Sequence, residues 1–151
     1  MTSAVQPVTG SVGEWRMPVL TIKDIMTENV RCARERDTLR DVHALMRMAG
    51  FRHVPIVDDD GKLAGIVSDR DVHLAWHGGT NQPVSGFMTR YTQWAHPDAR
   101  ARDVAARMLN DKIGCMPVVD AAGKVVGIVT ETDFLRVAHR ALSIQEAIAE
   151  E

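Results

Sequence analysis

The apolar positions near the start of this chain follow first a strand-like and then a helical pattern. Leu39, Val42 and Met46 recur at spacings of three and four residues, which places them on one face of a predicted helix that Gly50 ends. A short strand is expected before this helix, near Val30–Cys32.

Two short apolar runs follow the helix, at Val54–Val57 and Leu63–Val67. The segment between them, Asp58–Gly61, is a short turn, so the two runs are predicted to pair as a hairpin. A second helix is predicted from Ser68 to about Trp76. The order of predicted elements is therefore strand, helix, strand, strand, helix.

The whole pattern then occurs a second time. The segment Asp58–Asp71 returns as Asp120–Asp133, at a shift of 62 residues that also carries Gly61 onto Gly123. No insertion breaks this shift. A duplicated unit of this length predicts two similar halves that pack together, with a groove between them that suits a ligand. The second copy predicts a helix over 101–109, strands over 116–119 and 125–129, and a long last helix from Glu131.

The chain of 151 residues is divided by these patterns into three parts. Residues 1–16 lack a clear period and are predicted to form a flexible arm, although Trp15 could dock on the body or on a partner. The first copy spans 17–79, and the second spans 80–151 with its extended helix. Either copy alone would bury too little surface for comfortable stability, so we expect one shared core.

Composition and charge exclude several classes of protein. Hydrophobic residues make up 45% and charged residues 25%, as in ordinary globular domains, and a net charge of −2 gives no nucleic-acid footprint. No apolar run is long enough for a membrane helix, and no signal peptide is visible, so a cytoplasmic protein is expected. Two lone cysteines, Cys32 and Cys115, are expected to be reduced thiols. His73 and His77 have metal-ligand spacing but no evident third ligand, so no metal is expected.

Three elements of the sequence carry a family resemblance: Asp24-Ile25-Met26-Thr27, the Val-Pro-Ile-Val run at 54–57, and Gly-Ile-Val-Ser/Thr-x-x-Asp in both copies. Together they resemble a pair of cystathionine-β-synthase (CBS) domains, also called a Bateman module, over roughly residues 17 to 140. The resemblance implies an α/β (α+β) fold in which two pseudo-twofold related β-α-β-β-α repeats pack as one disc-like module with two clefts. It also implies binding of adenine nucleotides in those clefts, and association into a homodimer.

The residues of the repeated motif suit a nucleotide. Ser68 and Asp71 lie three apart on the first turn of a predicted helix, as do Thr130 and Asp133. Such a carboxylate can accept two hydrogen bonds from the hydroxyls of a ribose, and the hydroxyl with the helix N-terminus can meet a phosphate. The same spacing is also a capping box that simply starts a helix, and both roles can hold at once.

The two copies differ in charge around the expected clefts. The first has Arg52, His53 and Arg70 where the second has Gly114, Cys115 and Thr132, and phosphates need cations. If one cleft alone holds a charged nucleotide, the basic residues of the first copy are expected to serve it; the sequence leaves open which cleft Arg52 faces. The expected ligand-binding residues are Arg52, His53, Val54, Pro55, Ser68, Arg70, Asp71, Cys115, Met116, Pro117, Thr130 and Asp133.

The leading functional hypothesis is a regulatory module that binds AMP, ADP, ATP or a related adenosyl ligand and reports its state to a separate, unknown partner protein. The alternative is an interaction or scaffold protein that keeps the fold without the ligand. An enzyme is not expected, because no nucleophile with an adjacent base is visible.

Overall fold

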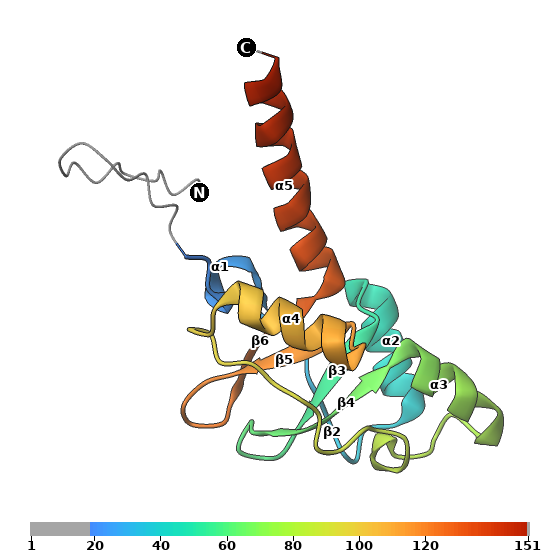
Figure 1. Ribbon diagram of the computed structural model, residues 1–151. Coiled ribbons are helices and arrows are strands. Elements are labelled where there is room, and N and C mark those ends of the chain that lie inside the picture. Colours follow the sequence, from blue (N-terminus) through green and yellow to red (C-terminus); the bar gives the residue numbers. More distant parts are fainter. Residues whose placement is uncertain (1–18, 151) are drawn as a thin grey trace.

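The computed structural model describes residues 19–150, so the predicted arm at 1–16 and its Trp15 lie outside the described residues. Figure 1 shows the elements in place. In chain order they are α1 (Ile22–Ile25), β1 (Thr27–Glu28), β2 (Ala33–Arg34), α2 (Leu39–Ala49), β3 (His53–Val57), β4 (Leu63–Ser68), α3 (Asp69–Ala75), the 3-10 turns η1 (Trp76–Gly78) and η2 (Val84–Gly86), α4 (Ala101–Asp111), β5 (Cys115–Val119), β6 (Val125–Thr130) and α5 (Glu131–Ala149).

The strands form two small sheets, one for each hairpin of the repeat. The first has the order β2-β3-β4 and the second the order β1-β6-β5. Val54 lies opposite Val67 in the first hairpin, and Met116 lies opposite Val129 in the second, so the two hairpins keep the same register. The mixed α/β fold predicted from the sequence, with one hairpin in each copy, is confirmed.

The segments that begin the two copies, which contain Thr27 and Thr89, each pair with the hairpin of the other copy. We call them the leading segments. Thr27, which belongs to the first copy in sequence, pairs with Ile128 of the second hairpin. The corresponding Thr89 pairs with Ile66 of the first hairpin. Each leading segment therefore adds an edge to the sheet of the other copy, and the backbone ties the two copies together in both directions.

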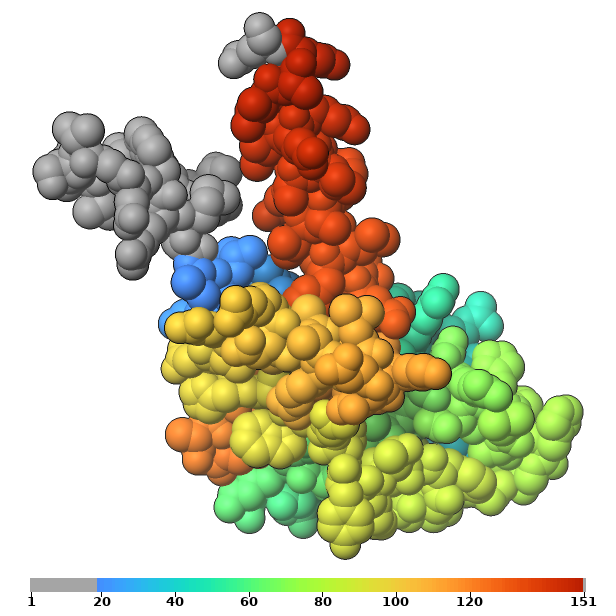
Figure 2. All heavy atoms as spheres, viewed as in Figure 1, coloured from blue at the N-terminus to red at the C-terminus, as the bar shows by residue number. Residues whose placement is uncertain are grey.

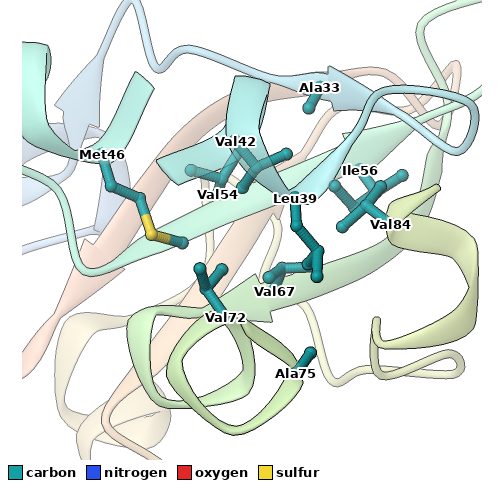
Figure 3. Close-up of a cluster of buried hydrophobic side chains, with 10 residues drawn as sticks. All are labelled: Ala33, Leu39, Val42, Met46, Val54, Ile56, Val67, Val72, Ala75 and Val84. Carbon is teal, nitrogen blue, oxygen red and sulfur yellow. The ribbon is translucent and has the colours of Figure 1, made fainter. Parts of the chain in front are cut away.

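The buried hydrophobic residues form two cores, so the expectation of one shared core is wrong, but each core includes a residue from the other copy. The first core is built on α2, β3, β4 and α3, and it includes Val84 from the leading segment of the second copy. Figure 3 shows the Val84 side chain beside Ile56. The second core is built on α4, β5 and β6, and it includes Ile22 from α1. Val84 and Ile22 are both 0% exposed, so each contributes about 1.5–3 kcal/mol of burial to the core of the other copy.

Capping boxes start the helices that follow the strands. At α2 the Thr38 hydroxyl accepts a hydrogen bond from the backbone N–H of Asp41, and the Asp41 carboxylate accepts one from the backbone N–H of Thr38. The same reciprocal pattern starts α3 and α5. The α2 helix ends at Gly50 with a φ of 70°, a left-handed conformation that glycine adopts without strain.

The last helix extends beyond the rest of the molecule. Its first turns pack on the second core through Phe134, and its C-terminal half projects away from the body (Figures 1 and 2). Leu142, Ile144 and Ile148 lie on this projecting part and are more than half exposed. The extended last helix predicted from the absence of a breaker after Glu131 is therefore present.

Most predicted boundaries shift by one or two residues, and two of the shifts have a clear physical reason. The strand expected near Val30–Cys32 lies at Ala33–Arg34, because parallel pairing of Ala33 with Ile56 places the small Ala33 side chain in the first core. Ser68 caps α3 and is not its first helical residue, since its backbone remains extended. Both differences are shifts of one to three residues in elements whose existence was predicted.

Two glycines allow the leading segments to cross the hairpins. A Cβ atom at Gly65 would lie 2.6 Å from the carbonyl oxygen of Thr89, and one at Gly127 would lie 2.9 Å from that of Thr27.

We therefore expect Gly65→Ala to lower the free energy of unfolding by about 1–3 kcal/mol, measured by urea denaturation, because backbone must move to admit the methyl group. Gly86→Ala is the control, since a Cβ there meets nothing within 4 Å. Equal urea midpoints for Gly65→Ala and Gly86→Ala would show that the segment containing Thr89 does not pass Gly65 closely.

Candidate functional site

A cavity of about 410 Å³ lies between the two copies. Its walls come from the end of α2 and the start of β3 in the first copy, and from the end of β6 and the start of α5 in the second. The leading segment of the first copy closes it with Thr27. The lining residues are Thr27, Gly50, Phe51, Arg52, His53, Gly114, Ile128, Thr130, Glu131, Thr132, Asp133 and Arg136.

Asp133 is the buried carboxylate of this cavity, with 5% of its surface exposed. Its Oδ2 atom accepts hydrogen bonds from the backbone N–H of Thr130 at 2.8 Å and from the Thr130 hydroxyl at 3.3 Å. Its Oδ1 atom accepts one from Arg136 at 3.3 Å. The capping role of this motif is therefore realised through one oxygen, while the other oxygen accepts a hydrogen bond from an exposed arginine, which a ligand would have to share or displace.

The first copy brings two basic side chains to the same cavity. Arg52 and His53 stand where the chain passes from α2 into β3, and the Arg52 carbonyl accepts a hydrogen bond from the backbone N–H of Asp69 at 2.8 Å. This bond fixes the position of the segment against the start of α3. Arg52 and His53 therefore line one cavity with Thr130 and Asp133 of the second copy, while the charges of Asp69 and Asp71 at the start of α3 also act on His53.

His53 is half-buried, and burial lowers the pKa of its imidazole below 6.5. The carboxylates of Asp69, Asp71 and Glu131 act in the opposite direction, but burial is the larger cause. The imidazole is therefore neutral at pH 7, and it can take up a proton when an anion arrives beside it.

Glu131 occupies the mouth of the cavity beside Gly114. Its backbone N–H donates to the Gly114 carbonyl at 3.1 Å, and a Cβ atom added to Gly114 would lie 3.4 Å from the carboxyl carbon of Glu131. The absence of a side chain at Gly114 therefore leaves room for this carboxylate.

The remaining predicted site residues do not line this cavity. Ser68 and Asp71 form the capping box of α3, with Ser68 N–H donating to Asp71 at 2.9 Å, and Arg70 lies on the same helical turn. Val54 and Met116 are 0% exposed in the two cores, so only their backbone could meet a ligand. Their role in binding, and that of Pro55 and Pro117 in the middle of β3 and β5, stays a prediction.

Cys115 is a buried thiol opposite Thr130 in the second hairpin. Burial, with a smaller effect from the Asp133 carboxylate, raises its pKa to about 12. The thiol is therefore protonated at physiological pH, and its possible contact with a ligand stays a prediction.

Sequence reasoning missed Arg136 and Phe51 as members of the cavity. Arg136 follows Asp133 by three residues on α5, so its helical spacing could have placed it on the same face. Phe51 gave no such signal, because its position depends on how the end of α2 meets the other copy.

A second cavity, of about 580 Å³, lies beside the two hairpin turns. Its lining includes Lys62, Asp120 and the exposed aromatic side chains of Tyr91 and Trp94. It contains none of the Ser/Thr-x-x-Asp residues. Trp94 is half exposed there.

Of the two histidines weighed as metal ligands, His73 has its Nδ1 atom 2.9 Å from the Asp69 carbonyl oxygen, and His77 lies in the 3-10 turn η1 that follows α3. Within residues 19–150, no three His, Cys, Asp or Glu side chains gather as a metal site would require.

Comparison with models of known protein families shows to which family the chain belongs. The family model for the CBS domain matches residues 22–78 and again residues 84–140. The chain belongs to the CBS domain family. The two matched ranges correspond to the two copies in the sequence, so the protein contains a tandem CBS pair.

Solved CBS structures resemble this one closely. The structure of a Vibrio cholerae protein assigned to acetoin utilization (AcuB) has a TM-score of 0.76 at 36% identity, and covers 86% of this chain and 98% of its own. The CBS domain pair of protein MJ0100, in complex with 5′-methylthioadenosine and S-adenosyl-L-methionine, has a TM-score of 0.77 at 31% identity, covering 82% and 99%. CBSX2 in complex with AMP has a TM-score of 0.71 at 27% identity, covering 80% and 97%.

The curated relatives that the chain matches are longer proteins, and the chain spans about a quarter of their length. They include enzymes, but the matches cover the CBS region. As for membranes, none of the helices within residues 19–150 combines the length and the apolar character needed to cross a bilayer.

The lowered pKa of His53 predicts a specific acid sensitivity. Because the folded protein disfavours the charged imidazole, its pKa lies below the unfolded value of 6.5. Stability from this residue is therefore complete above pH 6.5 and is lost as the pH falls below it, since the unfolded chain takes up the proton first. We expect the melting temperature to fall less in His53→Gln than in the wild type between about pH 7.5 and about pH 5.5.

The control for this experiment is His139→Gln, which removes an exposed imidazole from α5. It is expected to melt with the wild-type pH dependence. A wild-type pH dependence in His53→Gln as well would mean that burial does not act on this imidazole.

Proposed function

We propose that this CBS pair is a regulatory module that binds an adenosyl ligand, AMP, ADP or ATP, in the cavity between its two copies. The observation that carries the proposal is the meeting of Arg52 and His53 from one copy with Thr130 and Asp133 from the other around one cavity of about 410 Å³. Basic groups and a buried carboxylate in the lining of one cavity suit a phosphate and a sugar diol.

Each part of the ligand has a matching group in this arrangement. The Oδ1 atom of Asp133 would accept a hydrogen bond from a ribose hydroxyl. The positive end of the dipole of the nineteen-residue helix α5, together with Arg52, would attract the phosphate. Phe51 and Ile128 would provide apolar surface for the base.

Two kinds of comparison support this proposal. Membership of the CBS family supports a ligand-binding regulatory role. The structural neighbours include complexes with 5′-methylthioadenosine and S-adenosyl-L-methionine, with AMP and, for the cytosolic domain of the Mg²⁺ channel MgtE, with ATP. The lining residues add no nucleophile with an adjacent base, so we propose binding without catalysis.

We further propose that the module works in the cytoplasm as a homodimer and signals to a separate partner protein. Leu74, Leu109 and Leu135 are each at least 69% exposed on α3, α4 and α5, and such apolar side chains are better covered by another protein surface than by water. The ligand would act on that surface through α5, whose first turn lines the cavity. It can bias the surface only by binding one arrangement more tightly than another.

The test is ligand binding by the intact chain and by two matched variants. Asp133→Asn and Asp71→Asn each replace the acidic residue of a capping box, so both lose comparable stability. We expect millimolar AMP, ADP or ATP to raise the melting temperature of the wild type, because a ligand that binds only the folded state stabilises it. By calorimetric titration, Asp133→Asn should bind at least about tenfold more weakly, while Asp71→Asn keeps the affinity at this cavity.

No binding of any adenine nucleotide would contradict the proposed function. Loss of binding in Asp71→Asn alone would place the ligand in the other cleft.

One observation favours a second candidate, an interaction protein without a ligand. Arg136 already occupies the ligand-facing oxygen of Asp133, and α5 presents exposed Leu142, Ile144 and Ile148 beyond the body. A partner that binds the wild type and Asp133→Asn equally, with or without nucleotide, would support this candidate.

A further inference from the structure

The charges around the cavity are balanced. Two arginines, Arg52 and Arg136, and two carboxylates, Glu131 and Asp133, line it. His53 adds no charge at pH 7, because burial lowers its pKa. A site that holds a highly charged ligand needs a surplus of cations, and this site has none.

The two arginines are not equally available to a ligand. Arg136 donates a hydrogen bond to Asp133 at 3.3 Å, so its charge is already compensated. Arg52 forms no ion pair with any residue between 19 and 150, which leaves its guanidinium for a phosphate. One uncompensated cation and one helix N-terminus suit one phosphate group.

Glu131 is an exposed carboxylate in the lining of the same cavity. It is the first residue of α5, and its carboxylate packs at the mouth of the cavity beside Gly114. It also acts on His53, which places its charge beside the residues that would meet the phosphate. A phosphate chain that grows past Arg52 would therefore approach a carboxylate, and like charges at close range disfavour binding.

We infer that this cavity selects adenosyl ligands with a single phosphate or none over the triphosphate, and that Glu131 is the residue that sets this preference. The inference rests on the proposed function and deepens it. A monophosphate ester carries about −1.5 to −2 charges at pH 7, which Arg52 and the start of α5 can offset. The added charge of a triphosphate meets Glu131 without a further cation.

The experiment is a calorimetric titration of the full chain with AMP, ADP and ATP in magnesium-free buffer at one fixed ionic strength. The variant is Glu131→Gln, which keeps the shape of the side chain and removes its charge. The matched control is Glu146→Gln, which removes the same charge from an exposed position farther along α5. Circular dichroism and the melting temperature confirm that each variant is folded, and Glu131→Ala is measured as a second charge-removing variant.

The wild type is expected to bind AMP at least about tenfold more tightly than ATP, with ADP between them. Glu131→Gln should tighten ATP binding about tenfold and change AMP binding less than about threefold, so that the preference collapses. Glu146→Gln should keep the wild-type preference.

Two results would overturn the inference while leaving the proposed function intact: ATP binding at least as tightly as AMP to the wild type, or an unchanged AMP-to-ATP ratio in both Glu131 variants. Failure of all three nucleotides to bind the wild type would overturn the proposed function and this inference with it.

Discussion

Two short backbone pairings between the copies hold this module in the arrangement that makes a site. Thr27 pairs with Ile128, and Thr89 pairs with Ile66, so each copy supplies an edge to the sheet of the other. The glycines at 65 and 127 make the approach possible, because any side chain there would meet a carbonyl oxygen. Ile22 and Val84 follow their segments into the opposite cores, so folding of either copy depends on the other.

The cavity is a consequence of this exchange. Thr27 reaches its wall because the leading segment of the first copy runs along the second hairpin. The same arrangement sets the start of β3, with Arg52 and His53, against the start of α5, with Thr130 and Asp133. Since the lining combines Arg52 and His53 of one copy with the buried Asp133 of the other, a ligand held by both copies would register any change in how they pack.

The sequence was informative where one copy alone determines the structure. Periodicity and the 62-residue repeat predicted the helices and hairpins, and spacing predicted the capping boxes at Ser68 and Thr130. It could not show that Arg52 lines the cavity that contains Asp133, because that depends on contacts between the copies. Arg136 was accessible from its helical spacing, whereas Phe51 and Gly114 line the cavity only through tertiary packing.

The two copies differ most in the length of their last helices, α3 in the first and α5 in the second. The α3 helix stops after Ala75 and gives way to a 3-10 turn, whereas α5 continues to Ala149. One end of α5 therefore lines the cavity with Glu131 and Asp133, and the other presents apolar side chains such as Ile144 and Ile148 beyond the body. Because a continuous helix is stiff over this length, a ligand that moves its first turn must also move its exposed end.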